Sequence, residues 1–232
     1  MRVLGIIPAR GGSKGVPGKN TMVIDGKPLV QYAVESALRS KLISNVIVST
    51  DDPKIVKIAE EMGVKVHIRE ETLASDTSNV LDTVLAILRK LEEKEEPYDA
   101  IMLLQPTAPL RKSSDIDESI EMLLNLNVDG VVSVIPVGDH HPARMYKIDH
   151  NKLSALHPSL ETTRRQELPL HYIRNGCIYL VKTESLKKER TLMPINKGAY
   201  IMDAAWSANI DTQQDIVLLK YLMPLWKKEE QK

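Results

Sequence analysis

Short apolar runs alternate with amphipathic stretches along most of the chain. Apolar runs of four to eight residues are typical of buried strands, and apolar positions at a spacing of three or four residues are typical of helices. The expected strands are Val3–Ile7, Val46–Thr50, Val64–Ile68, Ala100–Leu104, Gly130–Val137, Gly176–Val181 and Ala199–Met202. The expected helices are Pro28–Arg39, Pro53–Gly63, Thr77–Lys90, Ser114–Leu126 and Thr212–Trp226. This alternation predicts βαβ units and a three-layer α/β fold with a mainly parallel sheet.

The alternation stops between residues 138 and 170. Met145–Ile148 followed by Asp149-His150-Asn151 indicates a hairpin, and the rest of this stretch has no clear period. No internal repeat or low-complexity linker divides the chain. We therefore expect a single domain over residues 1–232 with an excursion at residues 138–170.

Composition narrows the class of protein. Lys and Arg together number 31, as do Asp and Glu, so the formal net charge is zero. Nucleic-acid and membrane-surface binding normally require a basic excess, so we expect neither partner. Met1-Arg2 leads directly into the first expected strand, and we expect no signal peptide. The single cysteine, Cys177, excludes an internal disulfide and fits a reducing cytoplasm.

A glycine-rich basic loop follows the first expected strand. Residues 8–20 read Pro-Ala-Arg-Gly-Gly-Ser-Lys-Gly-Val-Pro-Gly-Lys-Asn, which places Arg10, Lys14 and Lys19 among four glycines. Glycines let backbone N–H groups approach a ligand closely, and the cations add charge-assisted donors for phosphate oxygens. The alternative is a basic surface turn. Open α/β sheets bind ligands at the carboxyl ends of strands, so we favour a polyphosphate cradle.

The loop lacks the Walker pattern and the dinucleotide-binding fingerprint, because Gly18-Lys19 is followed by Asn20 and no Gly-x-Gly-x-x-Gly is present. Instead, Ile-Pro-Ala-Arg-Gly-Gly-Ser-Lys-Gly-x-Pro-x-Lys-Asn resembles the signature of the sugar nucleotidyltransferases. Within that group it is similar to the acylneuraminate cytidylyltransferases, the CMP-sialic acid synthetases.

Two polar stretches that follow expected strands match further motifs of this family. Arg69-x-x-x-Leu-Ala-x-Asp-x-Ser78 resembles the stretch that holds the nucleoside, although Asp76 or Thr77 could simply cap a helix. Gln105-Pro-Thr107-Ala-Pro resembles the stretch that contacts the sugar acid, although it could be a proline-stiffened connector. The resemblance implies cytidine contacts from Arg69 and Ser78 and sugar contacts from Gln105 and Thr107.

The later part of the chain carries two more matches. Arg164-Arg165-Gln-x-Leu-Pro and Asn175-Gly-Cys177-Ile-Tyr179 resemble the family's sugar-acid region, with Cys177 replacing the usual Ala as an inert buried residue. Arginine suits a carboxylate clamp, which a nonulosonic acid would supply. Asn209-Ile-Asp211 stands where the family usually has Asp-x-Asp for magnesium, so the first carboxylate is missing. Asp211 could instead cap the closing helix.

The resemblance implies a complete set of functional expectations. The fold would be a Rossmann-like nucleotidyltransferase fold, with the excursion used to form a homodimer. The reaction would activate a nonulosonic acid with CTP and Mg²⁺, giving a CMP-sugar and pyrophosphate. The implied catalytic residues are Arg10, Lys19 and Asp211. The implied substrate-binding residues are Lys14, Asn20, Arg69, Ser78, Gln105, Thr107, Arg165, Asn175 and Tyr179, and the implied metal ligands are Asp211, Asn209 and Asp203.

Three alternatives stay open at this stage. The same chemistry could act on legionaminic or pseudaminic acid, or with another nucleotide base. The chain could also be a nucleotide-binding regulator without catalysis, a hypothesis motivated by Asn209.

Leu192-Met-Pro-Ile195 stands where relatives often carry aromatic residues near the N-acyl group, so we further expect an unusual sugar pocket there.

Overall fold

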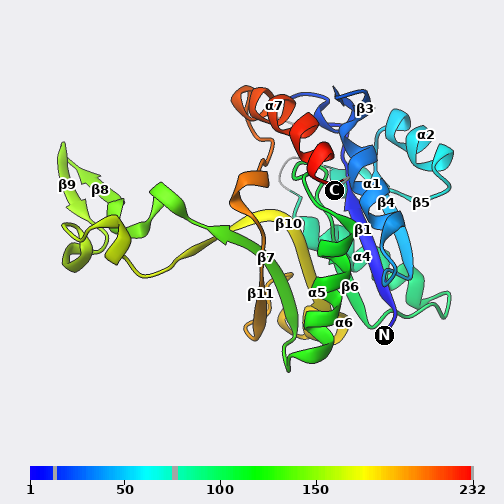
Figure 1. The fold of residues 1–232 in the computed structure, drawn as a ribbon. Helices are drawn as coiled ribbons and strands as arrows, with labels where there is room; N and C mark the ends of the chain where they lie inside the picture. Colours follow the sequence, from blue (N-terminus) through cyan, green and yellow to red (C-terminus); the bar gives the residue numbers. More distant parts are fainter. Residues whose placement is uncertain (13–14, 75–77, 231–232) are drawn as a thin grey trace.

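A seven-stranded sheet forms the centre of the molecule (Figure 1). The computed structural model describes residues 1–12, 15–74 and 78–230. The strands of the sheet are β1 (Val3–Pro8), β4 (Asn45–Thr50), β5 (Lys65–Ile68), β6 (Ala100–Leu103), β7 (Gly130–Pro136), β10 (Tyr172–Lys182) and β11 (Lys197–Ile201). They lie in the order β11-β7-β10-β6-β1-β4-β5, and only β10 runs antiparallel to its neighbours. The expected mainly parallel sheet is confirmed.

Helices cover both faces of this sheet. They are α1 (Leu29–Arg39), α2 (Pro53–Glu61), α3 (Glu71–Ala74), α4 (Val80–Glu92), α5 (Ser113–Asn125), α6 (Thr183–Glu189) and α7 (Gln213–Glu230). One core cluster joins the sheet to α1, α2 and α5, and a second joins its other face to α4 and α6. A third cluster packs α7 against α1 through Leu29, Tyr32, Leu219 and Met223. The apolar positions thus produce the predicted three layers. None of the described helices is long and apolar enough to cross a membrane.

Several element boundaries differ from the sequence-based expectation. Helix α4 begins at Val80 rather than Thr77, and its cap is Asn79, whose Oδ1 accepts a hydrogen bond from the backbone of Leu81 at 3.0 Å. The candidate caps Asp76 and Thr77 lie outside the described residues. The prediction missed the short helices α3 and α6, because neither offers enough turns to show a period.

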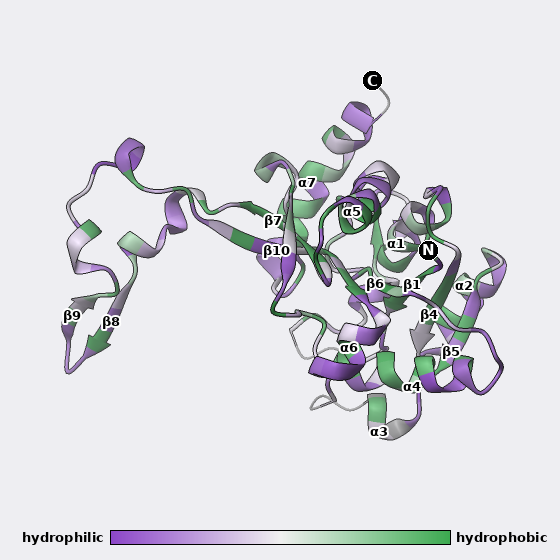
Figure 2. Cartoon of the chain, turned by 90° about the horizontal axis from the view of Figure 1, so that it is seen from below, coloured by the Kyte–Doolittle hydropathy of each residue, from purple (hydrophilic) through white to green (hydrophobic). Residues whose placement is uncertain are grey.

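The predicted excursion is a long arm that leaves the body between β7 and β10 (Figures 1 and 2). It carries the expected hairpin, formed by β8 (Tyr146–Asp149) and β9 (Lys152–Ala155). Its turn residues His150 and Asn151 both have positive φ, at 44° and 64°, as tight hairpin turns require. The segments before and after the hairpin are also joined, because the Arg144 guanidinium donates to the backbone oxygens of Glu161 and Thr163.

Strand β10 begins at Tyr172, before the predicted start at Gly176, and contains an irregular register between Arg174 and Tyr179. Asn175 lies inside this bulge and is buried. Its Oδ1 accepts from Ser133 Oγ at 2.6 Å and from the Cys177 N–H at 3.3 Å, while its Nδ2 contacts Met202 Sδ at 3.1 Å. These contacts fix the bulge to β7, so the amide of Asn175 is used inside the fold rather than presented to a substrate.

We expect Asn175→Ala to destabilise the protein. It removes a buried hydrogen bond from Ser133 and a second from the bulge backbone, which should lower the free energy of unfolding by about 1–3 kcal/mol. Chemical denaturation measures this change. Asn125→Ala, at the exposed end of α5, is the matched control and should stay within about 0.5 kcal/mol of the wild type. Unchanged stability together with weakened substrate binding would restore the predicted substrate contact.

Candidate active site

A cleft of about 210 Å³ opens at the carboxyl ends of the parallel strands. Pro8 ends β1, Arg69 follows β5, and Gln105 to Thr107 follow β6, so adjacent strand ends bring distant segments together. The residues that line the cleft are Pro8, Arg10, Lys19, Asn20, Arg69, Ser78, Val80, Gln105, Pro106 and Thr107. Seven of the predicted site residues therefore meet in one cavity.

The described lining of this cleft is positively charged. Arg10, Lys19 and Arg69 contribute three cations, and no acidic side chain is among the lining residues that the structure describes. Asn20, Ser78, Gln105 and Thr107 add uncharged hydrogen-bonding groups. A cavity with this composition is suited to a polyanion that also carries polar, uncharged parts.

The Arg69 side chain is 9% exposed and is held from behind. Its Nε donates to Ser49 Oγ at 3.1 Å, and the same hydroxyl contacts His67 Nδ1 at 3.1 Å. Burial lowers the pKa of Arg69, the Asp51 charge raises it, and nearby Arg10 lowers it further. Sequence reasoning missed Ser49 on β4 and His67 on β5, because a residue's place in a strand does not show which side chain of another element it contacts.

A hydrogen bond from Asn20, the last residue of the glycine-rich loop, to Arg10 joins the two ends of the loop. Asn20 Nδ2 donates to the Arg10 backbone oxygen at 2.8 Å, while its buried Oδ1 has no partner among the residues that the structure describes. Asp51, at the end of β4, accepts from the Gly11 N–H at 2.8 Å. Sequence reasoning missed Asp51 as a partner of the loop, although a carboxylate at a neighbouring strand end was a usable signal. Lys14, a predicted phosphate contact, lies outside the described residues.

The segment Asn209–Asp211 borders the cleft through Lys19. Lys19 Nζ donates to the Ile210 oxygen at 2.7 Å and lies 3.3 Å from Asp211 Oδ1. A Cβ on Gly15 would stand 2.3 Å from the Asp211 backbone oxygen, so the loop approaches this segment as closely as only glycine allows. The segment is not a strand. Asn209 and Asp211 still point the same way, with Nδ2 and Oδ2 3.4 Å apart, because Ile210 between them is buried.

Asp211 does not cap the closing helix. Asp215 accepts from the backbone N–H groups of Asp211 and Thr212, and Thr212 Oγ1 donates to it at 2.8 Å. These hydrogen bonds lower the pKa of the Asp215 carboxyl. The Asp211 side chain, 70% exposed, is therefore left facing Lys19.

The donor set fits a magnesium ion that is shared with a ligand. Asp211 supplies a carboxylate, and Asn209 would supply its amide oxygen if the amide turned, because its Nδ2 now faces Asp211. Mg²⁺ is usually held by one or two carboxylates together with substrate phosphates. Within the described part of the chain, no group of three or more His, Cys, Asp or Glu side chains could hold a metal by itself. Asp203 does not line this cleft. It lines another cavity with Asp115, and its Oδ1 accepts from the Ala205 N–H at 2.9 Å.

The other predicted residues do not line the cleft in a single chain. Arg165 is on the arm, where it pairs with Asp139 at 2.7 Å. Tyr179 packs into the core cluster beside α4, and burial raises its pKa. Cys177 is buried as expected, and burial raises the pKa of its thiol to about 11.

The expected sugar pocket at residues 192–195 is wrong. Pro194 lies against Gly130, which begins β7, and the Asp129 N–H donates to the Asn196 oxygen at 2.8 Å. This segment therefore packs at the amino end of β7, whereas the cleft is at the carboxyl ends of the parallel strands. Position in a sequence motif did not reveal which end of the sheet the segment reaches.

Comparison with solved structures confirms the fold. A CMP:2-keto-3-deoxy-manno-octonic acid synthetase complexed with CTP superimposes with a TM-score of 0.74 at 20% identity, covering 97% of this chain and 99% of that one. A 4-diphosphocytidyl-2C-methyl-D-erythritol synthase superimposes with a TM-score of 0.70 at 16% identity, covering 96% and 98%.

Sequence relatives are closer. A CMP-N,N'-diacetyllegionaminic acid synthase of Legionella pneumophila is 34% identical, with 97% of each chain covered. A pseudaminic acid cytidylyltransferase of Campylobacter jejuni is 26% identical, with 96% of each covered. An N-acylneuraminate cytidylyltransferase of Streptococcus agalactiae is 32% identical over 94% of this chain, which spans 52% of that relative's length. The cytidylyltransferase family matches residues 4–218, and the chain belongs to this family.

Proposed function

We propose that the protein is a cytidylyltransferase that activates a nonulosonic acid with CTP and releases pyrophosphate. The observation that carries this proposal is the cleft itself, in which Arg10, Lys19 and Arg69 meet the uncharged polar groups of residues 105–107. The cations suit a triphosphate, and the uncharged groups suit a base and a polyhydroxylated sugar. Relatives that match along nearly their whole length are named for legionaminic and pseudaminic acid.

The anomeric hydroxyl of the sugar acid attacks the α-phosphorus of CTP in this proposal. A new P–O bond forms as the attacking hydroxyl releases its proton to water. The bond from the α-phosphorus to the oxygen that bridges to the β-phosphate breaks, and pyrophosphate leaves with that bond's electron pair. Arg10 and Lys19 stabilise the charge that develops on the phosphates, and Lys14 would join them. Positioning and charge stabilisation supply most of the rate in such transfers, so no histidine base is required.

A magnesium ion fits beside Lys19. Asp211 and Asn209 would hold it together with phosphate oxygens, and it would polarise the α-phosphate when bound. Asn209 supplies no charge, so most of the protein's contribution to holding the ion falls on Asp211. Arg69 and Ser78 line the same cleft and would contact the nucleoside, as the resemblance of their motif to the family implies.

Pyrophosphate release tests the proposed reaction. A panel of CTP and other nucleoside triphosphates crossed with sialic, legionaminic and pseudaminic acids should give turnover with CTP and at least one of these acids. The competing candidate is a nucleotide-binding regulator, which the uncharged Asn209 beside Asp211 favours. Binding of CTP without pyrophosphate release from any pair would support that regulator and exclude the enzyme.

We further propose that two chains form a dimer through the arm at residues 138–170. Ile148 is 73% exposed, Leu153 65% and Leu170 80%, and such apolar exposure on a projecting arm favours a protein partner. The predicted carboxylate clamp, Arg165, is also on the arm. An arm that reaches a second copy would bring Arg165 to the partner's sugar acid. The free, buried Cys177 fits the cytoplasmic location that we propose for this enzyme.

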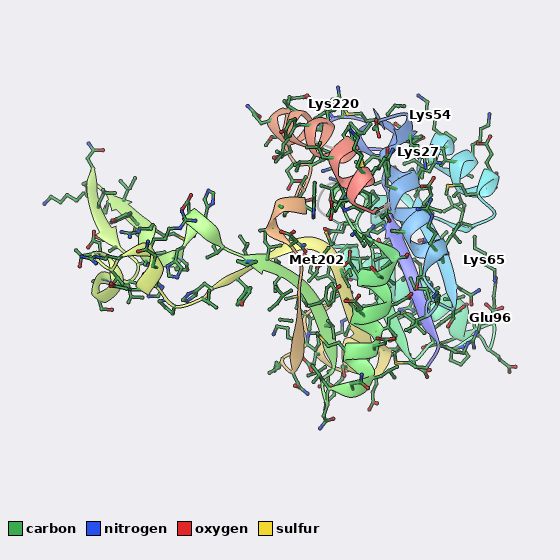
Figure 3. All side chains as sticks on the ribbon, viewed as in Figure 1. Lys27, Lys54, Lys65, Glu96, Met202 and Lys220 are labelled. Carbon is green, nitrogen blue, oxygen red and sulfur yellow. The ribbon has the colours of Figure 1, made fainter. Side chains whose placement is uncertain are left out.

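Lys19→Ala should lower kcat/KM for CTP by roughly 10- to 100-fold, because a charge-assisted hydrogen bond is worth about 1.5–3 kcal/mol. Steady-state kinetics with pyrophosphate detection measures the change. Lys220→Ala, on the exposed outer side of α7 (Figure 3), is the control and should leave the kinetics unchanged. Normal kinetics for Lys19→Ala would remove the loop from the reaction.

Asn209→Asp should lower the magnesium concentration needed for half-maximal rate, because a second carboxylate then faces the ion beside Asp211. Asp211→Ala should nearly abolish turnover at every magnesium concentration. Magnesium titrations of the rate compare these variants with Asp203→Asn, which should behave as the wild type because Asp203 lies outside the cleft. Normal turnover in Asp211→Ala would refute the metal assignment.

The double variant Ile148→Asp, Leu153→Asp should be monomeric. Placing two charges in an apolar interface costs several kcal/mol, so light scattering should give the mass of one chain, 26.0 kDa. Ile195→Asp is the matched control, since Ile195 is 87% exposed on the body of the molecule. Equal masses for the wild type and both variants would exclude these arm residues from the interface.

A further inference from the structure

A second cavity, of about 390 Å³, is larger than the cleft and shares no lining residue with it. It lies between one face of α1, the last turns of α7 and the loop that follows β6. The cleft and the cavity use opposite parts of this loop. Gln105 and Thr107 line the cleft, whereas Pro109 and Arg111 line the cavity.

Arg111 is the most unusual side chain of this wall, because it is a long cation that is only 1% exposed. Its Nη1 donates to the Cys177 oxygen at 2.6 Å and to the Ala108 oxygen at 3.4 Å, and its Nε donates to Ser36 Oγ at 3.3 Å. All three acceptors are uncharged. Its Nη2 has no partner among the described residues.

A buried guanidinium in this state is costly. Burial lowers the pKa of Arg111, and the Asp115 charge offsets this only in part. The Asp115 carboxylate is itself engaged by the Lys112 N–H and the Tyr200 hydroxyl. Buried charges are normally paired with an opposite charge and have all their hydrogen bonds satisfied. Arg111 is therefore a buried cation that forms no ion pair with any described residue.

The rest of the cavity lining is also rich in cations. The cations of the lining are Lys27, Arg39, Arg111 and Lys227, and the anions are Glu35 and Glu230. Glu35 pairs with Lys27 at 2.7 Å and with Arg39 at 3.7 Å, and Lys227 pairs with Asp25 at 2.6 Å. After these pairs are formed, Arg111 is the cation of the lining for which no ion pair is formed in the described structure.

We propose that this cavity binds a phosphate-type anion, with the guanidinium of Arg111 as its anchor. Nη2 is the guanidinium nitrogen of Arg111 whose N–H groups no described residue accepts, and such a charged donor suits a phosphate oxygen. Lys27, Arg39 and Lys227 supply the surrounding positive charge. The volume leaves room for a phosphomonoester as well as for inorganic phosphate, and Tyr32 and Trp226 form the aromatic part of the wall.

Fluorescence of Trp226 tests this site without reference to catalysis. The chain has two tryptophans, so Trp206→Phe leaves Trp226, in the cavity wall, as the only reporter. Titration with inorganic phosphate, at an ionic strength held constant with sodium chloride, should give a saturable change in emission. Lys19→Ala in the same background should retain the response, because Lys19 belongs to the cleft.

Arg111→Gln in the Trp206→Phe background should abolish the saturable response, and circular dichroism checks that the variant folds. Arg39→Gln changes a largely exposed cation of the same cavity and should weaken phosphate binding by at least about threefold even if Arg111→Gln is unstable. Parallel titrations with pyrophosphate and glycerol 3-phosphate decide whether the anion is a free phosphate or a phosphomonoester. Absence of saturation, an equal response to sodium chloride, or wild-type affinity in Arg39→Gln would overturn the proposal.

Discussion

The ammonium group of Lys19 joins the loop after the first strand to residues 210–211, which lie before the last helix, and the site depends on this contact. Lys19 comes from the first loop, while its acceptors, the Ile210 oxygen and the Asp211 carboxylate, come from the segment before the last helix. Gly15 permits the approach, since any Cβ there would collide with the Asp211 oxygen. Asn20 and Asp51 hold the loop from its other sides. Together these contacts place a basic loop and a hard oxygen donor on the same rim of one cleft.

Much of this arrangement could be predicted from the sequence because it depends on local pattern. Apolar runs and helical spacing gave the layers, and strand ends in a parallel sheet must meet at one edge. Residues immediately after a strand, such as Arg69, Gln105 and Thr107, were therefore brought together as expected. The close of α2 and the hairpin turn at His150-Asn151 were equally local and equally predictable.

Other features depended on contacts that no local pattern reveals. Asn175 resembled a ligand residue, yet its amide is used by Ser133 and by the bulge of β10, two elements far apart in sequence. Leu192–Ile195 could be placed only once β7 was known to begin beside it. Arg111 closely follows Gln105–Thr107, which line the cleft, but its side chain lines the second cavity. In each case the side chain's direction, rather than its position in the sequence, decided its surroundings.

The position of β10 has a consequence for how the chain folds. The strands β6, β1, β4 and β5 all lie within the first 103 residues and pair with one another, so this half of the sheet can form early during synthesis. Strand β7 pairs only with β10 and β11, which follow after the whole arm. Until residue 182 has been synthesised, β6 remains an exposed edge and β7 has no neighbour, and unpaired edges invite association with other chains. The arm thus sets the length of chain that must be synthesised before β10 can cover the exposed edge of β6.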